Sequence, residues 1–203
     1  MWHPSYNRVC RESELRKGMA SFIYQDVAQR FRPIPVVALY NPPLGSRLNK
    51  GDKHYSDDIM FAAELESRRL WEKYGFVMAP GDFNWRLGSS FGRSSDDDVK
   101  HGANARTEIA RQWISRTSLR PLHGRSGQCR EELTSRTHSG LASPDGIYCP
   151  KVIPIGWSAC ALPPPAWETY STAGGVHRPI GVVINYIAAI TACLWKCSWK
   201  GTC

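Results

Sequence analysis

The sequence predicts a mixed α/β fold, in which a sheet of buried strands carries helices on its outside. Short apolar runs bounded by proline or glycine at residues 35–40 and 76–79 are typical of buried strands. Residues 58–74 and 105–117 have helical boundaries or a helical apolar stripe. Because these helical segments alternate with strand-like ones, the order of elements indicates an α/β sheet.

The first half of the chain is expected to hold three strands and one helix. Residues 1–17 are rich in charge and are expected to form a poorly structured lead. Asp57 is expected to cap a helix that ends at Gly75. The other expected elements are strands at 18–27, 35–40 and 76–79, a polar loop at 44–56 and the helix itself at 58–74.

The second half is expected to begin with a flexible loop at 88–102, whose acidic run at 96–98 is better explained by solvation than by metal binding. Asn104 is expected to cap the second helix. The apolar stripe of this helix consists of Ala105, Ile109, Ala110, Trp113, Ile114 and Thr117. Further short strands are expected at 119–122, 133–137, 147–149 and 180–184.

The composition favours a folded, basic protein. The chain has 203 residues, of which 42% are hydrophobic and 22% charged, and its formal net charge is +8. This composition excludes a disordered chain. The positive charge suits a polyanionic partner, although the arginines between residues 106 and 136 are spread out and also fit a solvated face.

Cysteine usage and hydropathy suggest an intracellular protein, nuclear or cytoplasmic. The seven irregularly spaced cysteines form a poor disulfide framework, so reduced thiols are expected. Cys193, Cys197 and Cys203 imitate half of a zinc site but lack a second ligand pair. No signal peptide is expected at the N-terminus. The apolar run 180–195 is too short for a membrane span, so no membrane partner is expected.

The segment Gly81–Asn84 follows a predicted strand and carries a carboxylate and an amide. On an extended segment, Asp82 and Asn84 would point to one face and Phe83 into the packing. A carboxylate can activate water or bind a metal ion, while an amide can hold a phosphate oxygen. A strand followed by an Asx turn is the alternative interpretation.

Three more polar residues lie beside predicted strands. Tyr40 ends the strand stopped by Pro42 and Pro43, Asp145 lies at a strand entry, and His177 precedes a strand. Asp145 is the best acceptor to orient His177, and a tyrosine can donate a hydrogen bond to phosphate. With Asp82, these groups supply the parts of phosphodiester hydrolysis. Each also has an ordinary interpretation, as a strand-end aromatic, a turn residue or a polar residue before a strand.

Taken in chain order, the four segments that carry Tyr40, Asp82, Asp145 and His177 resemble the endonuclease/exonuclease/phosphatase superfamily. They most closely resemble the apurinic-type endonuclease domain of non-LTR retrotransposons. The resemblance spans residues 16–184 and is most specific at Gly-Asp-Phe-Asn (81–84) and His-Arg-Pro-Ile (177–180). It implies half to two-thirds of a four-layered α/β sandwich. The implied domain covers residues 18–184, followed by a Trp- and Cys-rich tail at 185–203.

The resemblance also implies roles for individual residues. Tyr40 would contact the scissile phosphate, Asp82 would activate water, and Asn84 would place the phosphate. Asp145 would share a polar site with His177, which would stabilise the pentavalent phosphorus. The implied cofactor is Mg²⁺ and the implied partner is DNA.

Two departures from the family bear on activity. The family's first third, with a strand ending in Asn and one ending in the metal-ligating Glu, is expected to be missing, and neither Glu12 nor Glu14 is assigned that role. Val176 stands where the family has Asp. Since Mg²⁺ needs hard oxygen ligands in a near-octahedral array, we expect weak metal binding.

The expected function is therefore metal-dependent phosphodiester hydrolysis of the retroelement DNA endonuclease type, degenerate in this chain. An inactive remnant that binds nucleic acid and a phosphatase of the same superfamily are the alternatives.

Overall fold

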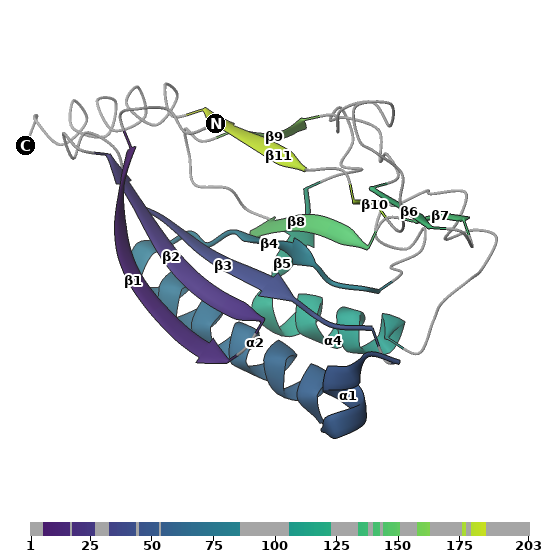
Figure 1. Cartoon of the computed structure of the whole chain (residues 1–203). Coiled ribbons are helices and arrows are strands. Elements are labelled where there is room, and N and C mark those ends of the chain that lie inside the picture. The colour runs from purple at the N-terminus through teal and green to yellow at the C-terminus, as the bar shows by residue number, and fades with distance from the viewer. Residues whose placement is uncertain are drawn as a thin grey trace, which may run out of the picture.

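A six-stranded mixed sheet forms the centre of the computed structural model (Figure 1). Its strand order is β1-β2-β3-β4-β8-β5, and only β3 and β4 are parallel neighbours. The strands are β1 (Tyr6–Arg16), β2 (Met19–Asp26), β3 (Ile34–Tyr40), β4 (Ala79–Asp82), β8 (Asp145–Pro150) and β5 (Leu119–Pro121). The structure describes residues 6–16, 18–26, 33–43, 45–52, 54–85, 106–122, 134–137, 140–142, 144–150, 158–162, 176–177 and 180–185.

Three helices and two small sheets complete the described part of the chain. Helices α1 and α2 connect β3 to β4, and α4 leads into β5. One small sheet has the order β10-β6-β7, and the other pairs β9 with β11. The helices are α1 (Arg47–Gly51), α2 (Tyr55–Tyr74) and α4 (Thr107–Thr117); the strands are β6 (Ser135–Thr137), β7 (Gly140–Ala142), β9 (Ser158–Leu162), β10 (Val176–His177) and β11 (Gly181–Asn185).

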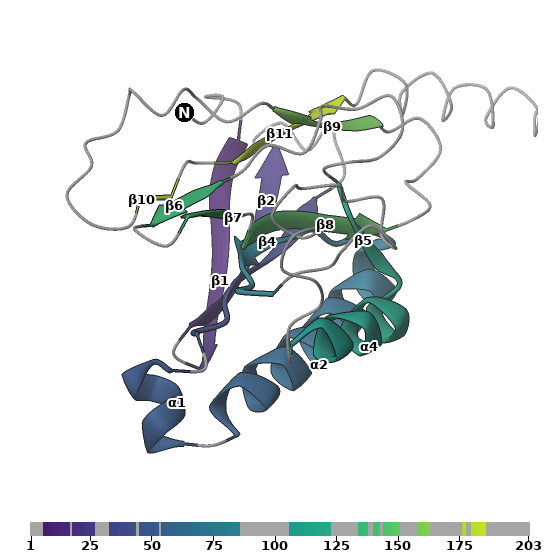
Figure 2. The same cartoon turned by 90° about the vertical axis from the view of Figure 1, so that its right-hand side faces the viewer.

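The central sheet is covered on both faces, and this explains its continuous apolar runs. Helices α2 and α4 lie side by side on one face, while β9 and β11 lie over the other (Figures 1 and 2). In β3, Val37 and Leu39 pack into the core under the helices, whereas Ile34 and Val36 pack into the core that Val182 and its β11 neighbours contact. The described residues thus form a layer of helices, the central sheet and a second sheet. This arrangement confirms the predicted partial α/β sandwich.

An aromatic cluster fills the helix-side core beneath the end of β4. Phe83, Trp85, Trp113 and Tyr148 contact one another, with ring centroids between 4.5 Å and 5.8 Å apart. The indole nitrogen of Trp85 donates a hydrogen bond to the Tyr148 hydroxyl at 2.7 Å. Phe83 is fully buried, as predicted. By contrast, Trp71 lies on the outer side of α2 and is 41% exposed.

The expectation of a poorly structured lead is also wrong, because residues 6–16 form β1. This strand pairs antiparallel with β2 along its length, with two irregularities in register. It is the edge strand of the sheet. An edge strand gains backbone hydrogen bonds from a single neighbour and tolerates charged residues, which protect it from pairing with other chains. A charged sequence is therefore compatible with a strand at this position.

The other elements agree in type with the predictions more often than in their bounds. Helix α2 ends at Gly75, whose φ of 69° provides the expected C-cap, but it begins at Tyr55, with His54 rather than Asp57 at the N-cap. The predicted loop at 44–56 contains α1, and β7, β9 and β10 were not predicted. The acidic run 96–98, Asn104 and residues 186–203 lie outside the described residues. No helix within the described ranges has the length and apolar character needed to cross a membrane.

Candidate active site

The pairing of three strands brings Tyr40, Asp82 and Asp145 to one edge of the central sheet. Tyr40 is the parallel partner of Asp82, and Asp82 is the antiparallel partner of Asp145. Gly81 permits the close approach of β3 and β4, because a Cβ atom at this position would lie 2.0 Å from the carbonyl oxygen of Leu39. Gly81 therefore has a structural role between β3 and β4, whereas Asp82 faces the site.

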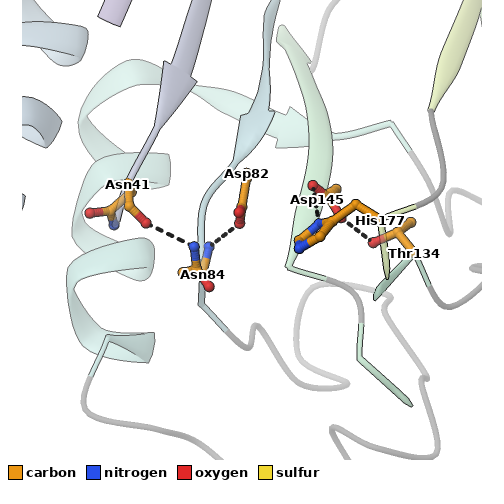
Figure 3. A network of polar contacts seen from close by, with 6 residues as sticks. All are labelled: Asn41, Asp82, Asn84, Thr134, Asp145 and His177. Carbon is orange, nitrogen blue, oxygen red and sulfur yellow. Dashed lines mark hydrogen bonds and ion pairs between the residues drawn. The ribbon is translucent and has the colours of Figure 1, made fainter. Parts of the chain in front are cut away.

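His177 reaches this edge from the β10-β6-β7 sheet, where it is the Cα partner of Ser135. Its Nδ1 lies 2.9 Å and 3.2 Å from the two carboxylate oxygens of Asp145 (Figure 3). Thr134 donates a hydrogen bond from Oγ1 to Asp145 Oδ2 at 2.7 Å. The predicted pairing of His177 with Asp145 is thus present. Thr134 was not predicted, since only the tertiary pairing of β6 brings it to the site.

Asp82, Asp145 and His177 form a cluster in which each residue offers one ligand atom within 4.8 Å of the others. Burial raises the pKa of Asp82, and the nearby charge of Asp145 raises it further, while His177 and the Asn84 hydrogen bonds act in the opposite direction. Two carboxylates held this close repel one another unless a proton or a cation lies between them. Their hard oxygen atoms fit Mg²⁺, so the donor set is compatible with the implied metal.

Asn84 does not continue the strand, and its side chain has a different position from the one predicted. Strand β4 ends at Asp82, and Asn84 has a φ of 49°, a left-handed conformation that Asn tolerates. Its backbone N–H donates to Asp82 Oδ1 at 3.1 Å, so the backbone forms the Asx turn of the alternative interpretation. The side-chain amide donates to the carbonyl oxygen of Asn41 at 3.0 Å (Figure 3). Asn84 therefore adjoins Asp82 but does not share a strand face with it.

The remaining predicted residues lie at the rim of the site or away from it. Tyr40 is 42% exposed at the end of β3. Val176 immediately precedes His177 in β10. Glu12 and Glu14 belong to β1, which is separated from β4 by β2 and β3.

Comparisons with known proteins support the fold. No family model matches the sequence, and no curated protein does so. Among solved structures, a 3′-5′ exonuclease (NExo) from Neisseria meningitidis resembles the chain with a TM-score of 0.55 and 14% identity, over 82% of this chain and 65% of that one. A variant of the 3′ phosphatase NExo from Neisseria bound to a product DNA hairpin gives a TM-score of 0.53 and 14% identity, over 82% and 64%.

The chain has the endonuclease/exonuclease/phosphatase fold. It spans just under two-thirds of the length of these two proteins. At 14% identity the similarity concerns the fold.

Proposed function

We propose that this chain is a metal-dependent phosphoester hydrolase that acts on nucleic acid. The convergence of Asp82, Asp145 and His177 at one sheet edge carries this proposal. The cluster combines a water-activating carboxylate with a histidine oriented by a second carboxylate, as phosphoester hydrolysis requires. The solved structures that share the fold, a 3′-5′ exonuclease and a 3′ phosphatase, support the same reaction class.

Each residue has a role that follows from its position. Asp82 accepts a proton from the attacking water, a task suited to a carboxylate whose pKa is raised. Asp145 holds His177 through Nδ1, which leaves Nε2 to donate to a phosphate oxygen as negative charge develops. The Asn84 amide donates one hydrogen to Asn41, and its second hydrogen, which stabilises the Asp82 carboxylate in the free chain, would donate to the phosphate of a bound substrate. The Tyr40 hydroxyl at the rim can donate to the phosphate as well.

Asp82 and Asp145 would hold the metal ion, for which Mg²⁺ is the candidate. A bound Mg²⁺ would supply positive charge to the phosphate and lower the pKa of water. Val176 offers no oxygen ligand, so we expect weak metal binding and an activity that is degenerate relative to the family. The proposed subtype is a DNA endonuclease of the retroelement type.

A 3′ phosphatase is the second candidate, because one structure of similar fold is a 3′ phosphatase bound to a DNA hairpin. Both activities use the same residues and differ only in whether the phosphate is internal or terminal. The net charge of +8 supports a DNA partner in either case. An inactive chain that binds DNA is the third possibility, supported by Val176.

The three possibilities are separated by one set of assays on the purified chain. Supercoiled plasmid reports nicking, and a DNA hairpin with a 3′-phosphate reports phosphate release, each with Mg²⁺ or Mn²⁺ and with EDTA. Asp82→Asn is the inactive control, and circular dichroism shows whether both proteins are folded. Metal-dependent turnover that Asp82→Asn abolishes supports the proposal, and the substrate consumed identifies the activity. DNA binding without turnover of either substrate refutes the hydrolase proposal in favour of the remnant.

A further inference from the structure

Arg106 is a buried arginine next to the candidate site that the proposed chemistry does not use. It lies at the N-cap of α4 and is only 3% exposed. Its guanidinium donates to the carbonyl oxygen of Asn41 at 3.4 Å, to the carbonyl oxygen of Pro42, and to Ser56 Oγ at 3.0 Å. Burying a charged group is costly unless it is well paired. These hydrogen bonds pair the buried guanidinium with the segment that follows β3 and with α2.

The Asn41 carbonyl joins Arg106 to the site. This oxygen also accepts the side-chain hydrogen bond from Asn84 at 3.0 Å. Two N–H groups of Asn41 bind the same segment: the backbone N–H donates to the Asp82 carbonyl at 2.8 Å and Nδ2 donates to the Phe83 carbonyl at 3.1 Å. Asn41 thus holds the Asp82–Asn84 segment on one side and is held by Arg106 on the other.

A second set of bonds fixes the segment that follows β3. Asn49 Nδ2 donates to the carbonyl oxygens of Pro42 and Pro43 at 3.1 Å and 2.8 Å. Ser56 Oγ, which accepts from Arg106, donates to Asn49 Oδ1 at 3.0 Å. Residues of α1, α2 and the start of α4 therefore converge on the three-residue exit from β3, directly after Tyr40.

We propose that Arg106 is a positioning residue. It binds the segment that follows β3 and thereby holds Asn84 and Tyr40 beside Asp82. This inference rests on the proposed hydrolase function for its kinetic consequences. A planar guanidinium can bind several carbonyl oxygens in fixed directions, whereas a lysine ammonium provides charge without the fork. Burial lowers the pKa of Arg106, and electrostatic interactions with Asp82, Asp57 and Tyr40 counteract this shift. The guanidinium therefore lies within electrostatic range of the site that it supports.

Arg106→Lys, Asn84→Ala and the double variant test the proposal kinetically. Each single variant is expected to lower kcat by about 10- to 100-fold, since a small misplacement of a substrate-binding group has an effect of this size. Because Arg106 acts in part through Asn84, the loss of kcat in the double variant should be clearly smaller than the product of the two single losses. Losses that multiply in the double variant would overturn the proposal, as would wild-type kcat in Arg106→Lys.

Arg69→Gln is the matched control for loss of a structural arginine. Arg69 donates twice to the buried Glu66, at 2.7 Å each, and lies 13 residues along α2 from Ser56, about 20 Å by helix rise. Its loss should lower the Tm but leave kcat unchanged. Ser56→Ala, which removes only one partner of the guanidinium, replaces Arg106→Lys if that variant does not fold, with a smaller loss in the same direction.

A structural measurement separates this inference from the proposed function. The side-chain amide resonances of Asn84 in a ¹⁵N–¹H NMR spectrum are assigned by their absence in Asn84→Ala. They should shift in Arg106→Lys and stay in place in Arg69→Gln, whether or not the wild-type protein hydrolyses DNA. If the wild type is inactive, the proposed function fails, and a shift of these resonances still supports the positioning role. Unmoved resonances in Arg106→Lys would refute that role.

Discussion

Asp82 and Asp145 are directly opposed residues of the antiparallel strands β4 and β8. Directly opposed positions lie about 4.5–5.5 Å apart between Cα atoms, so like charges there destabilise the pair. Asp145 is compensated by His177 and Thr134, but the pKa of Asp82 is raised by burial and by Asp145. The site thus holds a carboxylate that the fold does not fully neutralise.

Asp82→Asn should stabilise the protein at neutral pH in the presence of EDTA. A carboxyl whose pKa is higher in the folded state favours its protonated form there, so its ionisation at pH 7 opposes folding. Removing the charge should raise the Tm by about 2–4 °C at pH 7. The gain should vanish below about pH 4, where the unfolded carboxyl is protonated too. Differential scanning calorimetry of both proteins across this range checks the sign, and a lower Tm for Asp82→Asn at pH 7 would contradict it.

The rate of hydrolysis should fall on the acid side at a pH above the ordinary Asp value of about 4. The general base is lost when Asp82 is protonated, and its raised pKa moves this loss to higher pH. A bound cation favours the ionised carboxylate, so more Mg²⁺ should move the acid limb to lower pH. The measurement is kcat against pH at several Mg²⁺ concentrations. An acid limb that stays fixed as Mg²⁺ increases would indicate that Asp82 does not contact the metal.

His177→Gln should lower kcat by about 10²–10³ and change KM much less, because the histidine donates chiefly to charge that develops in the transition state. The side chain is 46% exposed, so the substitution should not unfold the protein. His54→Gln is the matched control, since His54 is exposed at the start of α2 and makes no side-chain cap hydrogen bond. Steady-state kinetics on the consumed substrate decides the question. An equal loss in both variants would exclude a specific role for His177.

The sequence was sufficient to name four of the residues that meet at the sheet edge, which are Tyr40, Asp82, Asp145 and His177, but not Thr134. Buried strands bounded by proline and glycine are readable as apolar runs, and polar residues at their ends gather at one edge when the strands pair. This is why Tyr40, Asp82 and Asp145 could be named before their register was known. The acceptor for His177 could be named because a histidine near a sheet edge needs one and Asp145 was the suitable acid.

The parts that could not be predicted depend on tertiary contacts. Arg106 is 65 residues from Asn41 in the sequence, and it belongs to a string of arginines of the kind that usually faces solvent. The left-handed φ of Asn84 leaves no periodic signal, so an extended continuation of β4 was the natural assumption. Strand β1 lacks apolar alternation because it lies at the sheet edge. In each case a partner distant in sequence determines the local conformation.

Gly81→Ala should be among the most destabilising single substitutions in the described part of the chain. The added Cβ would lie 2.0 Å from the carbonyl oxygen of Leu39 and 2.9 Å from its carbonyl carbon, and backbone atoms in a sheet cannot move aside without separating β4 from β3. We expect a loss of about 3–5 kcal/mol in the free energy of unfolding. Gly51→Ala is the control, because nothing lies within 4 Å of its added Cβ and alanine favours the helix by about 1 kcal/mol. Urea unfolding measures both variants. A Gly81→Ala protein within about 1 kcal/mol of wild type would mean that the strands can separate, and the Asp82 carboxylate would then not be held at a fixed distance from Tyr40.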